Sequence, residues 1–326
     1  MSHPFENLTP DFILDALDEF GWLTDGRQLA LNSYENRVSQ VGQEHGEPVI
    51  AKFYRPDRWS DEQILEEHAF AFELADHELP VVTPLARDGQ TLLHYQGFRF
   101  SVYPRRGGRA PALDDPDTLL VLGRTLARLH NIGETRRFEF RPTLTLQSHG
   151  LDSIDYLGEH FVPDDLRVAW DSLTRDLAAR LSQAFDAFGP QTLLRVHGDF
   201  HGGNVLWRDE IPNLVDLDDA RMAPAMQDIW MLLSGDAEQQ QQQLGDIVEG
   251  YEEFRDFPAR ELALVEPLRT LRMLYFAAWI ARRWDDPAFP KVFPWFNSPR
   301  YWGELILDLR NQLAALNEPA LVRPGQ

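Results

Sequence analysis

The sequence predicts an α+β chain of two lobes, a small lobe of sheet plus helix followed by a larger, mostly helical lobe. Short segments with strand-like alternation dominate the part of the chain before residue 104. A stretch dense in Gly and Pro then interrupts all periodicity at residues 104–111, and long helical patterns fill most of the remainder. We therefore expect one domain at residues 1–104 and a second at residues 105–326.

The predicted small lobe begins with a helix and continues as a sheet. Thr9 is a suitable helix cap, Pro10 suits the first helical position, and Gly21 ends the pattern. A second helix starts at Ser60 and runs to about His77. Strand-like segments lie at residues 28–32, 37–41, 48–54, 91–95 and 98–103.

The predicted large lobe is mainly helical. Between Thr192 and Leu217 the pattern changes to short apolar runs separated by turns. Two lobes that meet at a hinge create a cleft able to enclose a ligand. Apolar residues recur at helical spacing in residues 117–132, 164–188, 239–254, 260–283 and 298–316.

The composition excludes several classes of protein. There is no cysteine, which rules out disulfides and thiolate metal sites and fits a reducing compartment. The formal net charge of -21, from 52 acidic and 31 basic residues, repels nucleic-acid backbones and anionic lipid surfaces. No stretch reaches the roughly 18 apolar residues of a membrane span, and no secretory signal is evident. We expect a cytoplasmic monomer that binds neither nucleic acid nor membrane.

The most informative pattern is Val-His-Gly-Asp-Phe-His-Gly-Gly-Asn-Val-Leu at residues 196–206. Asp199 precedes Asn204 by five residues, the spacing of the proton acceptor and a magnesium ligand in protein kinase catalytic loops. In phosphoryl transfer the aspartate accepts the proton of the attacking hydroxyl, and the asparagine reaches a magnesium ion beside the phosphates. The glycines allow a tight loop that points both side chains to one place.

A second acidic segment, Leu-Val-Asp-Leu-Asp-Asp, follows at residues 214–219. Asp216 stands twelve residues after Asn204, which is enough for a strand, a turn at residues 209–213 and a returning strand. Such a hairpin brings Asp216 next to Asn204. A carboxylate and a carboxamide form a hard-oxygen pair suited to Mg²⁺. We expect Asp216 to act on the phosphates through the metal.

A charged side chain in the third strand-like segment needs an explanation. Lys52 lies in Val-Ile-Ala-Lys-Phe-Tyr at residues 49–54, whose alternation predicts a sheet with one face in a core. A lysine there can neutralise phosphate oxygens of ATP, and a carboxylate from the following helix should hold it. Glu66 and Glu67 are the candidates. We favour Glu67, because the helix face that contains it also contains Phe70 and would look toward the sheet.

Each feature has a simpler interpretation. Lys52 fits an exposed strand edge, where Lys is common. Residues 216–219 fit an exposed acidic turn or a calcium loop, although the twelve-residue calcium pattern is absent. His197 and His201 suggest zinc, with no third ligand evident. The order along the chain favours a kinase-like fold: Lys in a strand, Glu in the next helix, a hinge, Asp-x4-Asn and a later Asp.

One element of protein kinases is missing. Between the first two strands they carry a Gly-x-Gly-x-x-Gly loop over the phosphates. The corresponding stretch, Leu-Asn-Ser-Tyr-Glu-Asn-Arg-Val at residues 31–38, contains no glycine. Ser33 and the backbone amides beside it can contact phosphate instead, with Asn32 and Asn36 favouring a turn. An ordinary hairpin turn fits the same spacing.

Longer strings connect these features to known families. Residues 197–206 together with residues 215–220 resemble the aminoglycoside phosphotransferase and choline kinase superfamily. The resemblance to the bacterial stress response kinase A family is more specific and runs over nearly the whole chain. It is carried by residues 31–38, 52–56, 63–68 and 289–295.

The resemblance implies a bilobal protein-kinase-like fold and a cytoplasmic serine/threonine protein kinase of the stress response that phosphorylates itself. It implies Asp199 as proton acceptor, Asn204 and Asp216 as magnesium ligands, and Ser33 at the ATP phosphates. The first domain would then bind the nucleotide, with Lys52 at the phosphates, and the second would hold the catalytic residues and the acceptor.

The residues by themselves leave the acceptor open. We expect transfer of the γ-phosphoryl group of ATP to a Ser or Thr hydroxyl of a protein, with Mg²⁺ as cofactor. One alternative is a small-molecule kinase for homoserine, choline or an aminoglycoside, since an acidic cleft would suit a cation. Another is a pseudokinase scaffold that binds ATP. A pure scaffold would not need a proton acceptor, so the presence of Asp199 argues against it.

Overall fold

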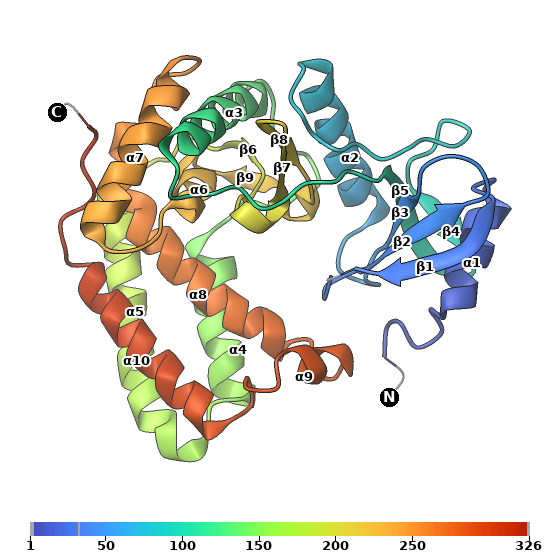
Figure 1. The fold of residues 1–326 in the computed structure, drawn as a ribbon. Helices are drawn as coiled ribbons and strands as arrows, with labels where there is room; N and C mark the ends of the chain where they lie inside the picture. The colour runs from blue at the N-terminus through green and yellow to red at the C-terminus, as the bar shows by residue number, and fades with distance from the viewer. Residues whose placement is uncertain (1–2, 32, 325–326) are drawn as a thin grey trace. The chain divides into compact units, whose positions relative to one another are not determined.

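The computed structural model describes residues 3–31 and 33–324. Contacts between residues divide it into two compact units, whose elements are labelled in Figure 1. The first unit takes in the chain up to Pro111 together with Phe138–Arg141 and Gly202–Ala220, and the second holds the remainder. The first unit is therefore assembled from three stretches of sequence. The functional boundary after residue 104 remains a prediction.

The sheet of the first unit has five antiparallel strands in the order β1-β2-β3-β5-β4 (Figure 1). Helix α1 (Pro10–Glu19) packs on one face, where its Leu17 shares a core with Ala51 and Phe53. Lys52 stands between these two residues in the strand and therefore points to the opposite face. The strands are β1 (Thr24–Ala30), β2 (Arg37–Gln43), β3 (Val49–Phe53), β4 (Leu93–Tyr95) and β5 (Phe98–Pro104).

Helix α2 (Asp61–Asp76) belongs to the same unit. Ser60 caps it and forms a capping box with Gln63, so local sequence fixes its start. Farther along α2, the Glu66 carboxylate accepts hydrogen bonds from the backbone N–H groups of Phe140 and Arg141 at 2.9 and 2.8 Å. This anchor explains why a four-residue segment, Phe138–Arg141, belongs to the first unit.

A β-hairpin completes the first unit. Strands β7 (Val205–Arg208) and β8 (Ile211–Leu214) pair antiparallel, and Asp209 and Glu210 turn between them with φ of 52° and 60°. Two positive φ values suit the tight turns that match the twist of a hairpin. The hairpin predicted between Asn204 and Asp216 is thereby confirmed.

The second unit is mostly helical. Helices α3 and α7 lie side by side (Figure 1). They approach closely because Gly123 faces α7 without a side chain: a Cβ there would lie 2.2 Å from the carbonyl oxygen of Ile247. Short strands β6 (Leu194–Val196) and β9 (Arg221–Ala223) pair antiparallel. The helices are α3 (Pro116–Glu134), α4 (Asp152–His160), α5 (Arg167–Phe188), α6 (Met226–Ile229), α7 (Ala237–Glu252), α8 (Val265–Ala281), α9 (Ala288–Val292) and α10 (Pro299–Ala315).

The predicted fold class is confirmed, with differences at element level. The patterns that begin at residues 164 and 260 start as 3₁₀ turns and become α5 and α8 only at Arg167 and Val265. Helix α4 was not predicted, because it is short and continues from an irregular turn without a side-chain cap. Within residues 3–31 and 33–324, no helix combines the length and the apolar character needed to cross a bilayer.

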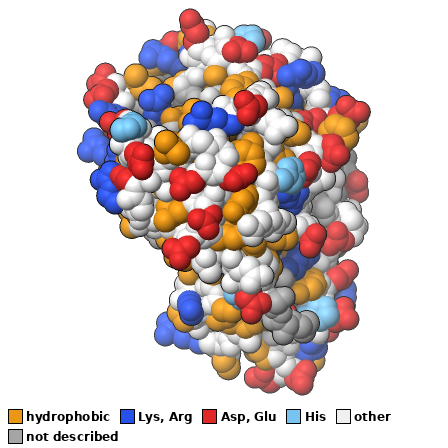
Figure 2. Space-filling model, turned by 90° about the vertical axis from the view of Figure 1, so that its right-hand side faces the viewer, with side chains coloured by type: hydrophobic (Ala, Val, Ile, Leu, Met, Phe, Trp, Pro, Cys, Tyr) orange, Lys and Arg blue, Asp and Glu red, His pale blue; other side chains and the backbone are white. Residues whose placement is uncertain are grey.

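Side chains of both charges are mixed on one face of the molecule. On the face drawn in Figure 2, Asp and Glu side chains alternate with Lys, Arg and apolar side chains.

Candidate active site

Lys52 is buried in the middle strand of the sheet, where it is 6% exposed, so the exposed-edge interpretation is wrong. Its Nζ lies 3.0 Å from Oδ1 of Asp216 and 3.2 Å from Oδ1 of Asp218. Burial lowers the pKa of Lys52, but the carboxylates of Asp216, Asp218 and Glu67 outweigh this effect and hold it well above its ordinary value. Lys52 is therefore a fixed positive charge within the first unit.

Asp218 is a buried partner that the sequence analysis did not assign to the site. Besides Lys52, its carboxylate pairs with Arg58 and accepts a hydrogen bond from Nδ2 of Asn36 at 3.2 Å. Burial raises the pKa of Asp218, but Arg58 and Lys52 lower it more, to about 2. The only sequence signal was a second Asp two residues after Asp216, since the partners lie far away along the chain.

The turn without glycine is tied to the same cluster. Asn36, which donates to Asp218, also accepts a hydrogen bond from the backbone N–H of Arg55 at 3.0 Å. The Ser33 hydroxyl donates to the carbonyl of Asn36 at 3.3 Å. Side-chain contacts therefore hold this turn. Asn32, which the sequence analysis also placed in it, lies outside the described residues.

The two candidate glutamates of α2 have different partners. Glu66 binds backbone N–H groups of residues 139–141, whereas Glu67 is buried. Among the described residues, Asp216 and Asp218 form the ion pairs with Lys52, and Glu67 acts on it only through charge at longer range. The expected ion pair between Lys52 and a glutamate of α2 is therefore absent among the described residues, where Asp216 and Asp218 lie closer to Lys52. Burial, opposed by Lys52, raises the pKa of Glu67 to about 7.

Asn204 and Asp216 lie at the two ends of the β7–β8 hairpin. The N–H of Val215 donates to the carbonyl of Asn204 at 3.1 Å, which joins the two ends. Asp216 has a φ of 59°, in the left-handed region, and its side chain is 54% exposed. One carboxylate and one carboxamide supply oxygen ligands of the kind that Mg²⁺ takes while it keeps several waters. The residues present therefore fit a magnesium ion.

The loop that carries Asp199 follows β6 in the second unit. Asp228 of α6 is fully buried and accepts hydrogen bonds from the backbone N–H groups of His197 at 2.9 Å and Gly198 at 2.8 Å. The side chain of Gln227 donates to the carbonyl of Gly198 at 3.1 Å. Two neighbouring side chains of α6 thus fix the backbone immediately before Asp199.

Two side chains meet the Asp199 carboxylate within the second unit. Nη2 of Arg272 on α8 lies 2.8 Å from Oδ1, and Nε2 of His201 lies 3.5 Å from Oδ2. The His197 ring is buried and accepts a hydrogen bond from the Asp199 N–H at 3.4 Å. Nothing in the sequence pattern pointed to Arg272. Among the residues that the structure describes, no three His, Cys, Asp or Glu side chains gather to hold a metal ion, so the zinc interpretation gains no third ligand.

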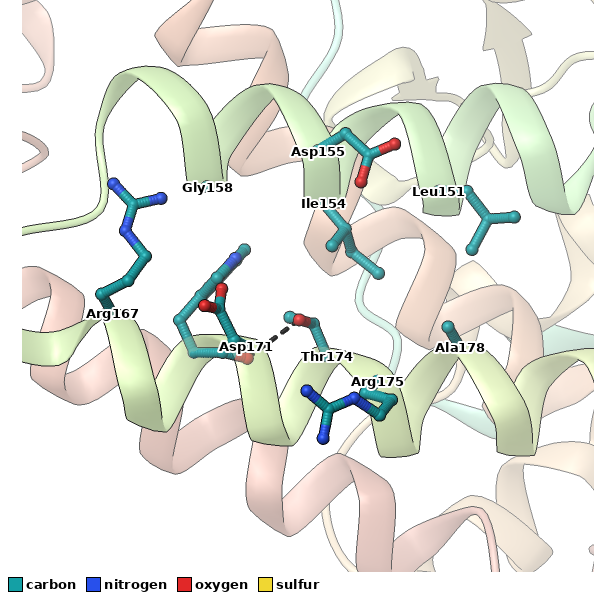
Figure 3. Close-up of a pocket in the computed structure, with 10 residues that line it drawn as sticks. Leu151, Ile154, Asp155, Gly158, Arg167, Asp171, Thr174, Arg175 and Ala178 are labelled. Carbon is teal, nitrogen blue, oxygen red and sulfur yellow. Dashed lines mark hydrogen bonds between the residues drawn. The ribbon is translucent and has the colours of Figure 1, made fainter.

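None of these residues lines a cavity of about 360 Å³ that is drawn in Figure 3. It is formed within the second unit between α4 and α5, where Ile154 and Asp155 face Thr174 and Arg175. The Thr174 hydroxyl is occupied by a hydrogen bond to the carbonyl of Trp170 at 2.8 Å. The residues with kinase-like chemistry do not line this cavity, so its size does not identify the active site.

Comparison with known proteins identifies the family. The model of the phosphotransferase enzyme family matches residues 27–264. Stress response kinase A of Escherichia coli (strain K12) is 46% identical over 97% of this chain and 96% of its own length. The serine/threonine protein kinase RdoA of Salmonella typhimurium is 44% identical over the same shares of the two chains.

Solved structures share the fold at low identity. The amicoumacin kinase hAmiN in complex with AMP-PNP and Ca²⁺ superposes with a TM-score of 0.72 at 18% identity, covering 92% of each chain. A microcompartment-associated aminopropanol kinase gives 0.71 at 21% identity, covering 92% of this chain and 94% of its own. The two solved structures establish the fold. The similarity to stress response kinase A and RdoA over 97% of the chain, together with the family model, establishes the family. The chain belongs to the phosphotransferase enzyme family.

Proposed function

We propose that this phosphotransferase is an ATP- and magnesium-dependent serine/threonine protein kinase. The observation that carries the proposal is the buried Lys52 held by Asp216, which shares a hairpin with Asn204. A phosphate-neutralising cation and oxygen ligands for a metal are thus combined in one unit. The choice of a protein acceptor is supported by the Salmonella typhimurium relative, which is 44% identical over 97% of the chain and is named a serine/threonine protein kinase.

The residues divide the reaction between them. Asp199 accepts the proton of the acceptor hydroxyl as its oxygen bonds to the γ-phosphorus and the bond to the β-phosphate oxygen breaks. Lys52 neutralises phosphate oxygens, and Ser33 with the backbone amides of its turn contacts the phosphates. Asn204 and Asp216 would hold Mg²⁺, which spreads the negative charge of the phosphates. Glu67 supports Lys52 through its charge.

The proposal also covers the location, the oligomeric state and the cellular role of the enzyme. We propose that it phosphorylates itself, that it acts as a cytoplasmic monomer, and that its role lies in a bacterial stress response. The name of the Escherichia coli relative supports the last point, and the lack of cysteine fits a reducing compartment. Residues 1–104 would serve nucleotide binding, and residues 105–326 catalysis and acceptor binding.

The test is transfer of labelled γ-phosphate from ATP with and without Mg²⁺. The acceptors are a generic protein, dephosphorylated casein, and a panel of homoserine, choline and aminoglycosides. Wild type is compared with Asp216→Asn and with Asp209→Asn, a matched control on the same hairpin that also replaces an aspartate with positive φ. We expect label on casein and on the enzyme itself, lost without Mg²⁺ and in Asp216→Asn but retained in Asp209→Asn.

Other outcomes would change the assignment. Label on a small molecule instead of on protein would keep the mechanism and replace the acceptor. Metal-dependent ATP binding without transfer to any acceptor would identify a scaffold. Full activity of Asp216→Asn would remove the proposed metal site.

A further inference from the structure

The contact between Arg272 and Asp199 carries an inference that rests on the proposed function and goes beyond it. We propose that Arg272 is a positioning residue, which holds the carboxylate of the proton acceptor in the orientation that the reaction requires. Nη2 of Arg272 lies 2.8 Å from Oδ1 of Asp199, so the two side chains form an ion pair.

The backbone of the Asp199 loop is fixed, but its carboxylate still needs an orienting contact. Asp228 and Gln227 hold the backbone of His197 and Gly198, so the position of the Asp199 Cα is set from α6. These contacts do not determine how the carboxylate is rotated. A general base acts within hydrogen-bond reach of the proton that it accepts, so rotation of this group affects the rate directly.

Arg272 is well placed to set that rotation because it projects from a rigid element. The neighbouring Leu271 and Leu274 of α8 are buried, and Tyr275 stacks on His149 with ring centroids 4.4 Å apart. The guanidinium also lies 6.0 Å from the centre of the Phe276 ring, one turn farther along the helix. A cation held over an aromatic ring has a restricted position.

The partial exposure of Arg272 separates this role from a structural one. Its side chain is 33% exposed and that of Asp199 is 15% exposed, so solvent screens the cationic side of the pair. Replacement of Arg272 should therefore leave the protein folded. Arg269, one turn earlier on α8, provides a matched control, since it pairs with Glu266 at 3.2 Å and hydrogen-bonds Gln240.

The first experiment measures kcat and KM for phosphate transfer to dephosphorylated casein, with ATP affinity measured separately. In Arg272→Gln we expect kcat to fall about 10- to 100-fold while the KM for ATP changes less than about 2-fold, because misorientation affects the chemical step. Arg272→Lys keeps the charge and should recover most of the loss. Arg269→Gln should behave as wild type. A normal kcat in Arg272→Gln, or no recovery in Arg272→Lys, would overturn the proposal.

The second measurement does not depend on activity. Carboxyl ¹³C NMR, with the Asp199 signal assigned from its loss in Asp199→Asn, follows titration in wild type and in Arg272→Gln. Arg272 from α8 and His201 from the same loop contact this carboxyl, and the His197 ring accepts a hydrogen bond from the Asp199 N–H. Since a guanidinium favours the ionised form, the midpoint should move to higher pH in the variant.

An unchanged midpoint would show that Arg272 does not hold Asp199 and would overturn the inference. If wild type transfers no phosphate to any acceptor, the proposed function fails, and the titration by itself then decides whether Arg272 holds the carboxylate. A shifted midpoint with normal kcat would again overturn the positioning role.

Discussion

The carboxylates around Lys52 and the carboxylate of Asp199 are held in contrasting ways. In the first unit, Asp218 is buried and shares Lys52 and Arg58 with its neighbours. In the second unit, Asp199 meets a partly exposed Arg272, and buried Asp228 fixes the preceding backbone. The first arrangement holds the Asp218 carboxylate between two largely buried cations. The second fixes the backbone before Asp199 and leaves its side chain 15% exposed beside a partly exposed cation.

Glu67 and Asp218 sharpen the contrast within one unit. Both residues are 3% exposed, yet the pKa of Glu67 is raised to about 7 and that of Asp218 is lowered to about 2. Burial raises both, but Asp218 has Arg58 and Lys52 in direct contact, whereas Glu67 feels Lys52 at longer range. Contacts with cations, and not burial, decide which carboxyl is ionised at neutral pH.

The largest effect is expected at Asp199. Asp199→Asn removes the proton acceptor and should lower kcat about 10²- to 10⁴-fold, with nucleotide binding largely intact. The measurement is labelled-phosphate transfer together with ATP binding by calorimetry. Normal turnover in this variant would contradict the role of Asp199, and loss of ATP binding would place the residue in nucleotide binding instead.

The next effect concerns the buried cluster. Asp218→Asn removes a charge shared by Lys52 and Arg58, and it should lower the free energy of unfolding by about 3 kcal/mol at pH 7, because buried cations lose a partner. Urea unfolding measures this loss, provided that the free energy of unfolding depends on urea concentration with the same slope in the variant and in wild type. If the variant were as stable as wild type, Asp216 and Asp219 would be sufficient partners for these cations.

The contributions of Glu67 and Asp218 to the free energy of unfolding should change in opposite directions with pH. The folded-state pKa of Glu67 is raised above the ordinary 4.5, so between pH 4.5 and about 7 the folded state binds more protons than the unfolded state. Stability from this group therefore falls as pH rises through that window, by roughly 3 kcal/mol at most. For Asp218, whose pKa is lowered, stability is present above pH 3.8 and falls as pH drops toward 2.

Glu67→Gln tests this sign. The unfolding free energy of wild type minus that of the variant should fall between pH 5 and pH 8. Glu261 of the second unit also has a pKa raised by burial to about 7, but it is present in both proteins and cancels in the difference. A difference that is flat with pH would mean that Glu67 is ionised throughout.

The smallest effect is expected on the surface. Arg124 and Glu253 form two hydrogen bonds, at 2.8 and 2.6 Å, but both side chains are 42% exposed. Arg124→Gln should change the free energy of unfolding by less than about 1 kcal/mol, and the change should shrink further in high salt. A loss comparable to that of Asp218→Asn would show that pairing geometry outweighs burial in this protein.

Local patterns in the sequence were sufficient for much of the fold and part of the site. The cap at Thr9, the capping box at Ser60 and the hairpin between Asn204 and Asp216 depend on residues close together in the chain. Helix α4 was missed because it has only nine residues and no side-chain cap marks its start. The predicted ion pair between Lys52 and Glu67 of α2 was wrong. The carboxylates that pair with Lys52 are those of Asp216 and Asp218, which follow β8.

The sequence by itself determined the order of the lobes, the spacing of Asp199, Asn204 and Asp216, and the position of Lys52 in a strand. These follow from periodicity and from distances counted along the chain. Only the tertiary structure decided that Asp218 is buried, that Glu66 anchors backbone, and that Arg272 meets Asp199. The physical reason is that ion pairs and burial join residues far apart in sequence, and an isolated Arg or Asp carries no sign of the partner that folding brings to it.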